Sequence, residues 1–168
     1  MVDRRQHRET VYGNKAVNQD SWFQPHAASS LRLIEGCADK DAHIIDVGAR
    51  AQSVQWIAGD ITRAELPAAR YDVWHDRAVF HFLTDSADRA RYVAQLLKSV
   101  KPGGYVIVAA FGPGGPLQCS GLDVMHYAPD TLHAEFGVPF RLLRHETEIH
   151  HTPSGQEQEF VYCYCVRI

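Results

Sequence analysis

The chain has 168 residues, of which 45% are hydrophobic and 22% are charged, and its formal net charge is −3. These values are typical of one globular domain with its own core, and they exclude the strong basic field that would favour nucleic acid or an acidic membrane surface. The sequence contains no apolar run of membrane-spanning length and begins without the apolar core of a signal peptide, so we expect a cytoplasmic protein. The cysteines lack CxxC spacing and are expected to be reduced thiols.

Helical and strand patterns alternate along the chain after a polar segment, residues 1–20, which we expect to be poorly ordered. Residues 21–168 are expected to form a single α/β domain. The sequence predicts helices at 29–35, from a cap at Thr84, Asp85 or Ser86 to Val100, and at 129–136, and strands at 43–47, 54–57, 71–74, 105–110, 140–149 and 160–168. This alternation indicates a mostly parallel sheet whose functional residues lie at the carboxyl ends of its strands.

Two of these segments make more specific predictions. The middle helix is expected to bury one face, on which apolar residues recur every three or four positions: Ala90, Val93, Leu97 and Val100. The last two strands are separated by a turn at 153–155, which predicts an antiparallel pair at the edge of the sheet.

Four short stretches occur in a recognisable order: IIDVG at 44–48, GDIT at 59–62, WHDRAVFHFL at 74–83 and LKSVKPGGY at 97–105. Together with the closing strand pair they resemble class I S-adenosylmethionine-dependent methyltransferases, in particular small bacterial members with the WHDRAVFHFL stretch. The resemblance runs from about residue 21 to the end of the chain. It implies a Rossmann-like fold with a C-terminal antiparallel hairpin.

The resemblance also implies where the cofactor would bind. In the family, a DxGxG loop passes close to the methionine part of the cofactor, and an acidic residue after the next strand holds the ribose. Here Arg50 occupies the position of the second glycine, and only residues 49–53 separate Gly48 from the strand expected at 54–57. We interpret this gap as an internal deletion of most of the glycine loop, the first helix and the second strand. The residues that remain for the cofactor are Asp46, Gly48, Asp60 and Ile61.

The deletion has two expected consequences. Several hydrogen bonds to the cofactor are lost, each contributing about 1 kcal/mol, so conventional S-adenosylmethionine binding becomes doubtful. In addition, parallel neighbours need a crossover of about a dozen residues or more, which residues 49–53 cannot provide. The strand at 54–57 then either turns back as a hairpin or joins a second subunit, and we expect a homodimer by strand exchange through residues 48–60.

Polar side chains follow the strand at 71–74, and we take His75, Asp76 and His81 as candidate catalytic residues. Imidazoles with a carboxylate suit a Zn²⁺-type ion, which makes bound water a hydrolytic nucleophile. The candidate metal ligands are His75, Asp76, His126 and His150. A structural hydrogen-bond network around residues 75–77 is the alternative interpretation. A hydrolase with a serine or cysteine nucleophile is less favoured, because Ser120 lacks a GxSxG turn and Cys119 lies in a glycine-flanked loop.

Three functions remain open from the sequence. The favoured one is a methyltransferase-derived enzyme that hydrolyses esters or phosphoesters of a small-molecule substrate in a cleft lined by His and Asp, with or without a divalent metal such as zinc. The alternatives are an S-adenosylmethionine-dependent methyltransferase with a reduced cofactor site and a non-catalytic dimeric remnant.

Overall fold

The protein is an α/β fold built on one five-stranded mixed sheet in the order β1-β2-β3-β7-β6. The computed structural model describes residues 21, 23–24, 27–47, 57 and 59–168. β1 (Ile44–Val47), β2 (Tyr71–Arg77) and β3 (Val100–Phe111) are parallel neighbours, whereas β7 (Glu157–Arg167) runs antiparallel to both β3 and β6 (Phe140–His151). The α/β prediction with a C-terminal antiparallel hairpin is therefore confirmed.

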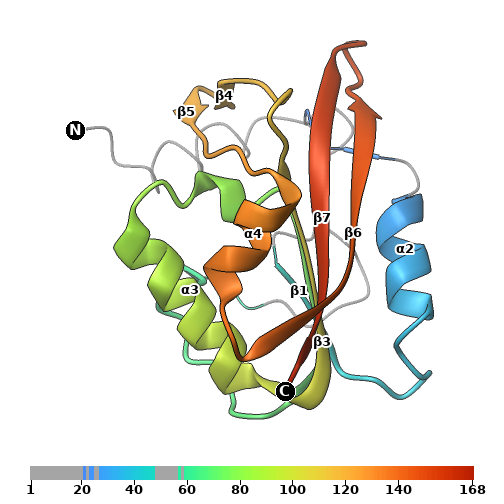
Figure 1. Cartoon of the computed structure of the whole chain (residues 1–168), viewed down its shortest axis with the longest axis vertical. Coiled ribbons are helices and arrows are strands. Elements are labelled where there is room, and N and C mark those ends of the chain that lie inside the picture. The colour runs from blue at the N-terminus through green and yellow to red at the C-terminus, as the bar shows by residue number, and fades with distance from the viewer. Residues whose placement is uncertain (1–20, 22, 25–26, 48–56, 58) are drawn as a thin grey trace.

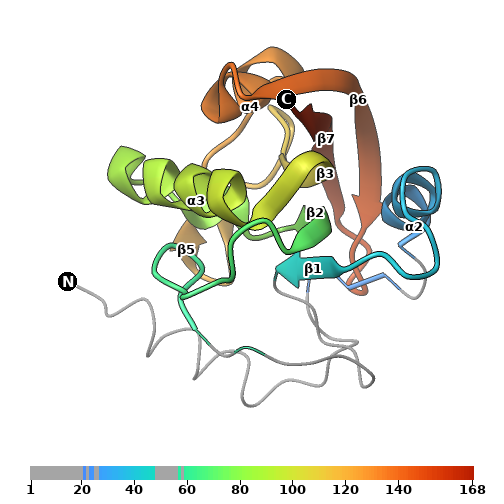
Figure 2. The same cartoon turned by 90° about the horizontal axis from the view of Figure 1, so that it is seen from below.

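Helices cover the two faces of the sheet unequally. α2 (Ala28–Glu35) lies against one face, whereas α3 (Ser86–Ser99) and α4 (Pro129–Phe136) lie on the other, as Figure 1 shows. The view from below in Figure 2 separates α2 from α3 in the same way. Smaller elements follow the strand ends: the 3₁₀ turn η2 (Phe80–Phe82) and the short strands β4 (Gln118–Cys119) and β5 (Leu122–Asp123). None of the helices in the described part of the chain is long and apolar enough to cross a membrane.

Each face of the sheet has its own hydrophobic cluster, because successive residues of a strand point to opposite sides. On β2, Trp74 packs in the cluster beneath α3 and α4, whereas Val73 packs in the cluster beneath α2. Val161 and Tyr162 divide in the same way on β7. The sheet thus directs neighbouring residues of one strand into different environments, and this alternation continues into the polar residues that end β2.

The segment 101–104 forms an irregularity at the start of β3 rather than a simple helix stop. Tyr71 pairs with Val100 and Val73 with Tyr105, so the register between β2 and β3 shifts there. A side chain at Gly104 would meet the backbone oxygen of Lys101 at 2.9 Å, which explains the glycine. β3 therefore begins at Val100, before the start predicted at residue 105, because the register shift acts as a bulge after which pairing resumes at Tyr105.

The predictions for the helices were correct in position, but the buried face of α3 was predicted only in part: Val100 is buried and Val93 packs against the core. Asp85 caps α3 by accepting a hydrogen bond from the Ala87 N–H, and Gly137 ends α4 with a positive φ of 69°. The residues that α3 buries are Tyr92, Leu96 and Ser99, whereas Ala90 and Leu97 are exposed. The predicted apolar face did not include Tyr92, whose ring packs in the core and whose hydroxyl is hydrogen-bonded to the buried Asp76 and Trp74 side chains. The strand predicted at 54–57 lies outside the described residues except for Ile57, which is not in a strand.

Candidate functional site

The carboxyl ends of β1 and β2 lie side by side and bring together the polar residues predicted for the site. Asp46 pairs in register with His75, and Val47 with Asp76. In parallel α/β sheets, ligands bind at this edge. The following residues 48–56, which include the candidate Gly48, lie outside the described part of the chain. In the described residues, the site consists of the strand ends and the elements that pack against them.

Asp46, His75 and Ser30 form a hydrogen-bonded series. The Nδ1 of His75 lies 2.9 Å from Oδ1 of Asp46, and its Nε2 lies 2.8 Å from the Ser30 hydroxyl oxygen. The Asp46 side chain is 44% exposed, whereas His75 is buried and Ser30 is only 2% exposed. An Asp–His–Ser order can activate a serine nucleophile, but this hydroxyl lies beneath α2 and is closed to a substrate. Asp46 is the member of the series that faces solvent.

The series continues from Ser30 into the face of the sheet beneath α2. The Ser30 hydroxyl lies 3.4 Å from that of Tyr162, and the Nε of Arg77 donates to Tyr162 over 3.0 Å. Arg77 also donates to Glu148 over 3.1 Å and lies over the ring of Phe160, with 4.3 Å between the guanidinium carbon and the ring centroid. The Arg77 side chain is only 8% exposed, and its pairing with Glu148 offsets part of the cost of burying its charge.

His150 belongs to the same polar layer and is held by the chain before α2. Its Nε2 lies 2.7 Å from the carbonyl oxygen of Ser21, and its Nδ1 lies 3.2 Å from the side-chain nitrogen of Gln24. Gln24 also donates to Glu148 over 2.8 Å. Burial lowers the pKa of His150 below its ordinary value, which favours the neutral ring. Both ring nitrogens are engaged, so His150 is a structural residue here.

Asp76 points to the opposite face of the sheet and is completely buried. Its Oδ2 accepts a hydrogen bond of 2.6 Å from the Tyr92 hydroxyl, and its Oδ1 accepts one of 3.0 Å from the Val79 N–H. Tyr92 in turn accepts a 2.9 Å bond from the Trp74 indole. Burial raises the pKa of Asp76 to about 6, although both hydrogen bonds act in the other direction. Asp76 therefore connects β2 to α3 and to the turn that follows β2.

The other two candidate histidines lie apart from this series. His81 is fully buried and stacks on Phe111, with 4.0 Å between ring centroids and 5° between ring planes. The Nε2 of His126 lies 2.9 Å from the carbonyl oxygen of Pro116, across the loop after β3. Within the described residues, no three His, Cys, Asp or Glu side chains are grouped so that they could hold a metal ion. The predicted metal site is wrong, because its four ligands face different partners.

Asp60 and Ile61 form the start of a turn between β1 and β2. The Oδ1 of Asp60 accepts hydrogen bonds from the backbone N–H and the hydroxyl of Thr62, at 2.9 Å and 2.8 Å. The Asp60 side chain remains 58% exposed, and Ile61 packs against the cluster that contains Val47 at the end of β1. S-adenosylmethionine carries a positively charged sulfonium and ammonium group, so exposed carboxylates such as Asp46 and Asp60 fit its charge.

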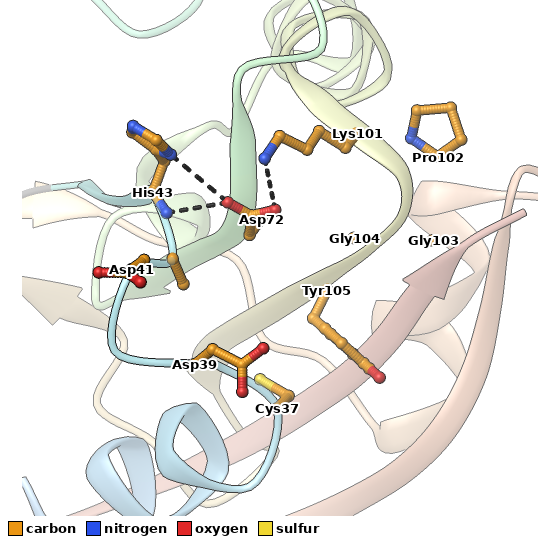
Figure 3. Close-up of a pocket in the computed structure, with 11 residues that line it drawn as sticks. Cys37, Asp39, Asp41, His43, Asp72, Lys101, Pro102, Gly103, Gly104 and Tyr105 are labelled. Atoms are coloured by element: carbon orange, nitrogen blue, oxygen red, sulfur yellow. Dashed lines mark hydrogen bonds and ion pairs between the residues drawn. The ribbon is translucent and has the colours of Figure 1, made fainter.

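A hollow of about 480 Å³ lies at the opposite, amino-terminal ends of the parallel strands. Figure 3 shows His43 and Lys101 both directed at Asp72. The backbone nitrogen of His43 lies 2.9 Å from Oδ2 of Asp72, and Nζ of Lys101 lies 2.6 Å from its Oδ1. These contacts hold the pKa of Asp72 below its usual range. The three groups satisfy one another and join β2 to β3, so we assign them a structural role.

Comparison with known proteins adds a match to one sequence family over part of the chain. The sequence model of the methyltransferase domain family matches residues 30–108. No curated protein sequence is significantly similar to the chain.

The solved structures that are similar to this one include the following three. A SAM-dependent methyltransferase from Methanosarcina mazei has a TM-score of 0.63 and 11% identity, over 81% of this chain and 97% of that one. An S-adenosylmethionine-dependent methyltransferase from Mesorhizobium loti has a TM-score of 0.50 and 15% identity, over 71% and 72% of the two chains. A protein described for the conversion of a disulfide bond into a thioacetal group in echinomycin biosynthesis has a TM-score of 0.53 and 12% identity. The match covers 65% of this chain and 54% of that one, about half of its length.

These comparisons support the resemblance seen in the sequence and correct two predictions drawn from it. The favoured hydrolase was wrong, because the domain match over residues 30–108 indicates methyl transfer, and the structure groups no metal ligands within its described residues. The doubt about S-adenosylmethionine was also wrong, because the match to the methyltransferase domain favours this cofactor. The sequence analysis did not find Ser30, Tyr162 and Tyr92, whose hydroxyl groups belong to the hydrogen-bond networks of His75 and Asp76.

Proposed function

We propose that the chain is an S-adenosylmethionine-dependent methyltransferase with a reduced cofactor site. The observation that carries the proposal is the position of Asp46: an exposed carboxylate at the carboxyl end of β1, held by His75, in a sheet with the methyltransferase fold. The methyltransferase domain match over residues 30–108 includes this strand end and supports the same activity. The internal deletion after Gly48 remains part of the proposal, since it rests on the sequence.

The residues of the chain would contribute binding and orientation. The bound cofactor supplies a methyl group on a sulfonium, ready for transfer to a nucleophile of the acceptor. Asp46 would bind the ammonium group of the methionine part, because its carboxylate is exposed and is hydrogen-bonded to His75, whose ring is held in place by Ser30. Asp60 and Ile61 would hold the adenine side, where Thr62 restrains the Asp60 carboxylate. Such preorganised charges contribute to affinity because they need no reordering when the ligand binds.

Cofactor binding tests the proposal without knowledge of the acceptor. We expect S-adenosylhomocysteine to bind the wild type in isothermal titration calorimetry, and Asp46→Asn to weaken binding about tenfold to a hundredfold, since a hydrogen bond to a charged group contributes about 1.5–3 kcal/mol. Asp41→Asn is the matched control, because Asp41 is an exposed carboxylate at the opposite end of the sheet. Absence of wild-type binding at millimolar ligand would contradict the proposal.

A homodimer by strand exchange stays a prediction from the sequence. Most of the segment proposed to exchange, residues 48–60, lies outside the described residues, and β1 is the edge strand of the described sheet. An edge strand has backbone groups available for pairing with a second chain. We expect a dimer mass in light scattering at micromolar concentration, and a clean monomer would contradict the prediction.

A further inference from the structure

The hydrogen-bonded series between Arg77 and Asp46 has two ends of fixed character. The Arg77 guanidinium can only donate, and the ionised Asp46 carboxylate can only accept. Tyr162, Ser30 and His75 lie between them, and each can both donate and accept. The direction of every hydrogen bond in the series can therefore be derived from its two ends.

Starting from Asp46, the carboxylate requires a hydrogen on Nδ1 of His75. A neutral ring with its hydrogen on Nδ1 has an acceptor at Nε2, so the Ser30 hydroxyl donates to His75. The Ser30 oxygen can then accept from the Tyr162 hydroxyl, whose oxygen accepts from Arg77. All hydrogens point along one path, from the buried cation to the exposed carboxylate.

A doubly protonated His75 ring fits the series less well. Nε2 would then donate to Ser30, and the Ser30 hydroxyl would have to donate to Tyr162. The Tyr162 oxygen would accept from both Ser30 and Arg77, and its own hydrogen would have no further acceptor in this series. Tyr162 is 1% exposed, so a hydrogen without a partner there is costly. The neutral ring with hydrogen on Nδ1 is the arrangement that uses every group.

The series also joins two parts of the protein. Ser30 lies in α2, whereas His75 and Asp46 lie at the strand ends of the proposed cofactor site. Arg32, two residues further along α2, donates a hydrogen bond from Nη1 to Glu146 of β6 over 3.2 Å. α2 is thus held to β6 by Arg32 and to β2 by the Ser30 hydroxyl, which contacts His75.

We propose that Ser30 and His75 are positioning residues that fix the direction of the Asp46 carboxylate, and that they thereby couple the docking of α2 to cofactor binding. The proposal rests on the methyltransferase function proposed above. A fixed carboxylate matters more here than in a site with a complete glycine loop, because Arg50 stands where the second glycine would lie. Ser30 acts through His75 and does not itself contact the cofactor.

The first measurement needs no ligand. In nitrogen-15 spectra of histidine-labelled protein, with His75 assigned by a His75→Gln variant, we expect hydrogen on Nδ1 and a bare, hydrogen-bonded Nε2. Ser30→Ala should remove the hydrogen bond at Nε2 and change the Nε2 shift. A wild-type ring with hydrogen on Nε2 would overturn the series, because the directions derived above could not hold.

The second measurement is the affinity for S-adenosylhomocysteine. We expect Ser30→Ala to weaken binding about tenfold, which corresponds to about 1.4 kcal/mol. Ser30→Thr and Ser30→Val have nearly the same shape and differ in the hydroxyl, so Thr should bind more tightly than Val even if both are less stable than the wild type. Ser99→Ala is the matched control, because Ser99 is fully buried and its hydroxyl has no partner among the described residues.

The outcomes separate the two proposals. Wild-type binding with equal affinities for the Ser30→Thr and Ser30→Val variants would overturn the positioning role and leave the methyltransferase function standing. Absence of wild-type binding would overturn the function and the positioning role together, while the spectra would still decide the direction of the hydrogen bonds. The expected tautomer together with a hydroxyl-dependent affinity would support both.

Discussion

His75 and Asp76 are consecutive residues of β2, yet they belong to different halves of the molecule. His75 faces α2 and connects to an exposed carboxylate, whereas Asp76 faces α3 and is enclosed by Tyr92, Val79 and the core. The sequence suggested that they act together on one substrate, but a strand directs neighbouring side chains to opposite faces. His75 therefore serves the proposed site, whereas Asp76 holds the sheet to its helices.

Asp76→Ala gives the strongest test of this division. It leaves the Tyr92 hydroxyl and the Val79 N–H without their acceptor in a buried place, so we expect the free energy of unfolding to fall by about 4 kcal/mol. Urea denaturation followed by circular dichroism measures the change. Asp41→Ala, which removes an exposed carboxylate, should change it by less than about 0.5 kcal/mol. A small effect of Asp76→Ala would contradict the structural role.

The pH dependence of stability tests the same residue without deleting its contacts. The folded pKa of Asp76 is about 6 against an ordinary value of 3.8, so between these values the folded state holds the proton more strongly. Its contribution is therefore fully present below about pH 4, and it is lost as the pH rises through about 6, by about 3 kcal/mol in total. Tyr92, His75 and Asp46 are the titratable groups whose charges or hydrogen bonds affect it.

Asp76→Asn isolates this contribution, because the other titrating groups are present in both proteins. Urea unfolding at steps between pH 3.5 and 7 should show the stability of the wild type decreasing relative to the variant as the pH rises. A difference that stays constant across this range would show that Asp76 is not held with a raised pKa.

Tyr92→Phe should have the next largest effect. It removes the hydroxyl that donates to Asp76 and accepts from the Trp74 indole, so we expect a loss of about 2 kcal/mol in the free energy of unfolding. Tyr127→Phe is the matched control, because the Tyr127 hydroxyl is also buried but has no hydrogen-bond partner in the described part of the chain. We expect that variant to be as stable as the wild type. Equal losses in the two variants would break the comparison.

The sequence predicted the local elements well because their signals are local. The Asp85 cap, the Gly137 stop and the closing strand pair each depend on a few adjacent residues. The partners of His75 and Asp76 depend instead on tertiary structure, since Ser30 lies 45 residues from His75 along the chain. Tyr92 was missed for a related reason: the apolar pattern of α3 counts hydrophobic residues and does not register a tyrosine whose hydroxyl binds a buried aspartate.

Asp46→Ala should have the smallest effect on stability and completes the comparison. Its side chain is 44% exposed and is hydrogen-bonded to His75, so we expect a change of about 1 kcal/mol or less in urea unfolding. The same variant should bind S-adenosylhomocysteine much more weakly than the wild type, because the carboxylate proposed for the ligand is gone. Asp76→Ala should show the opposite pattern: a large loss of stability and, among the molecules that remain folded, a smaller loss of affinity for S-adenosylhomocysteine. If Asp46→Ala unfolded as readily as Asp76→Ala, both carboxylates would be structural and the proposed division of β2 would fail.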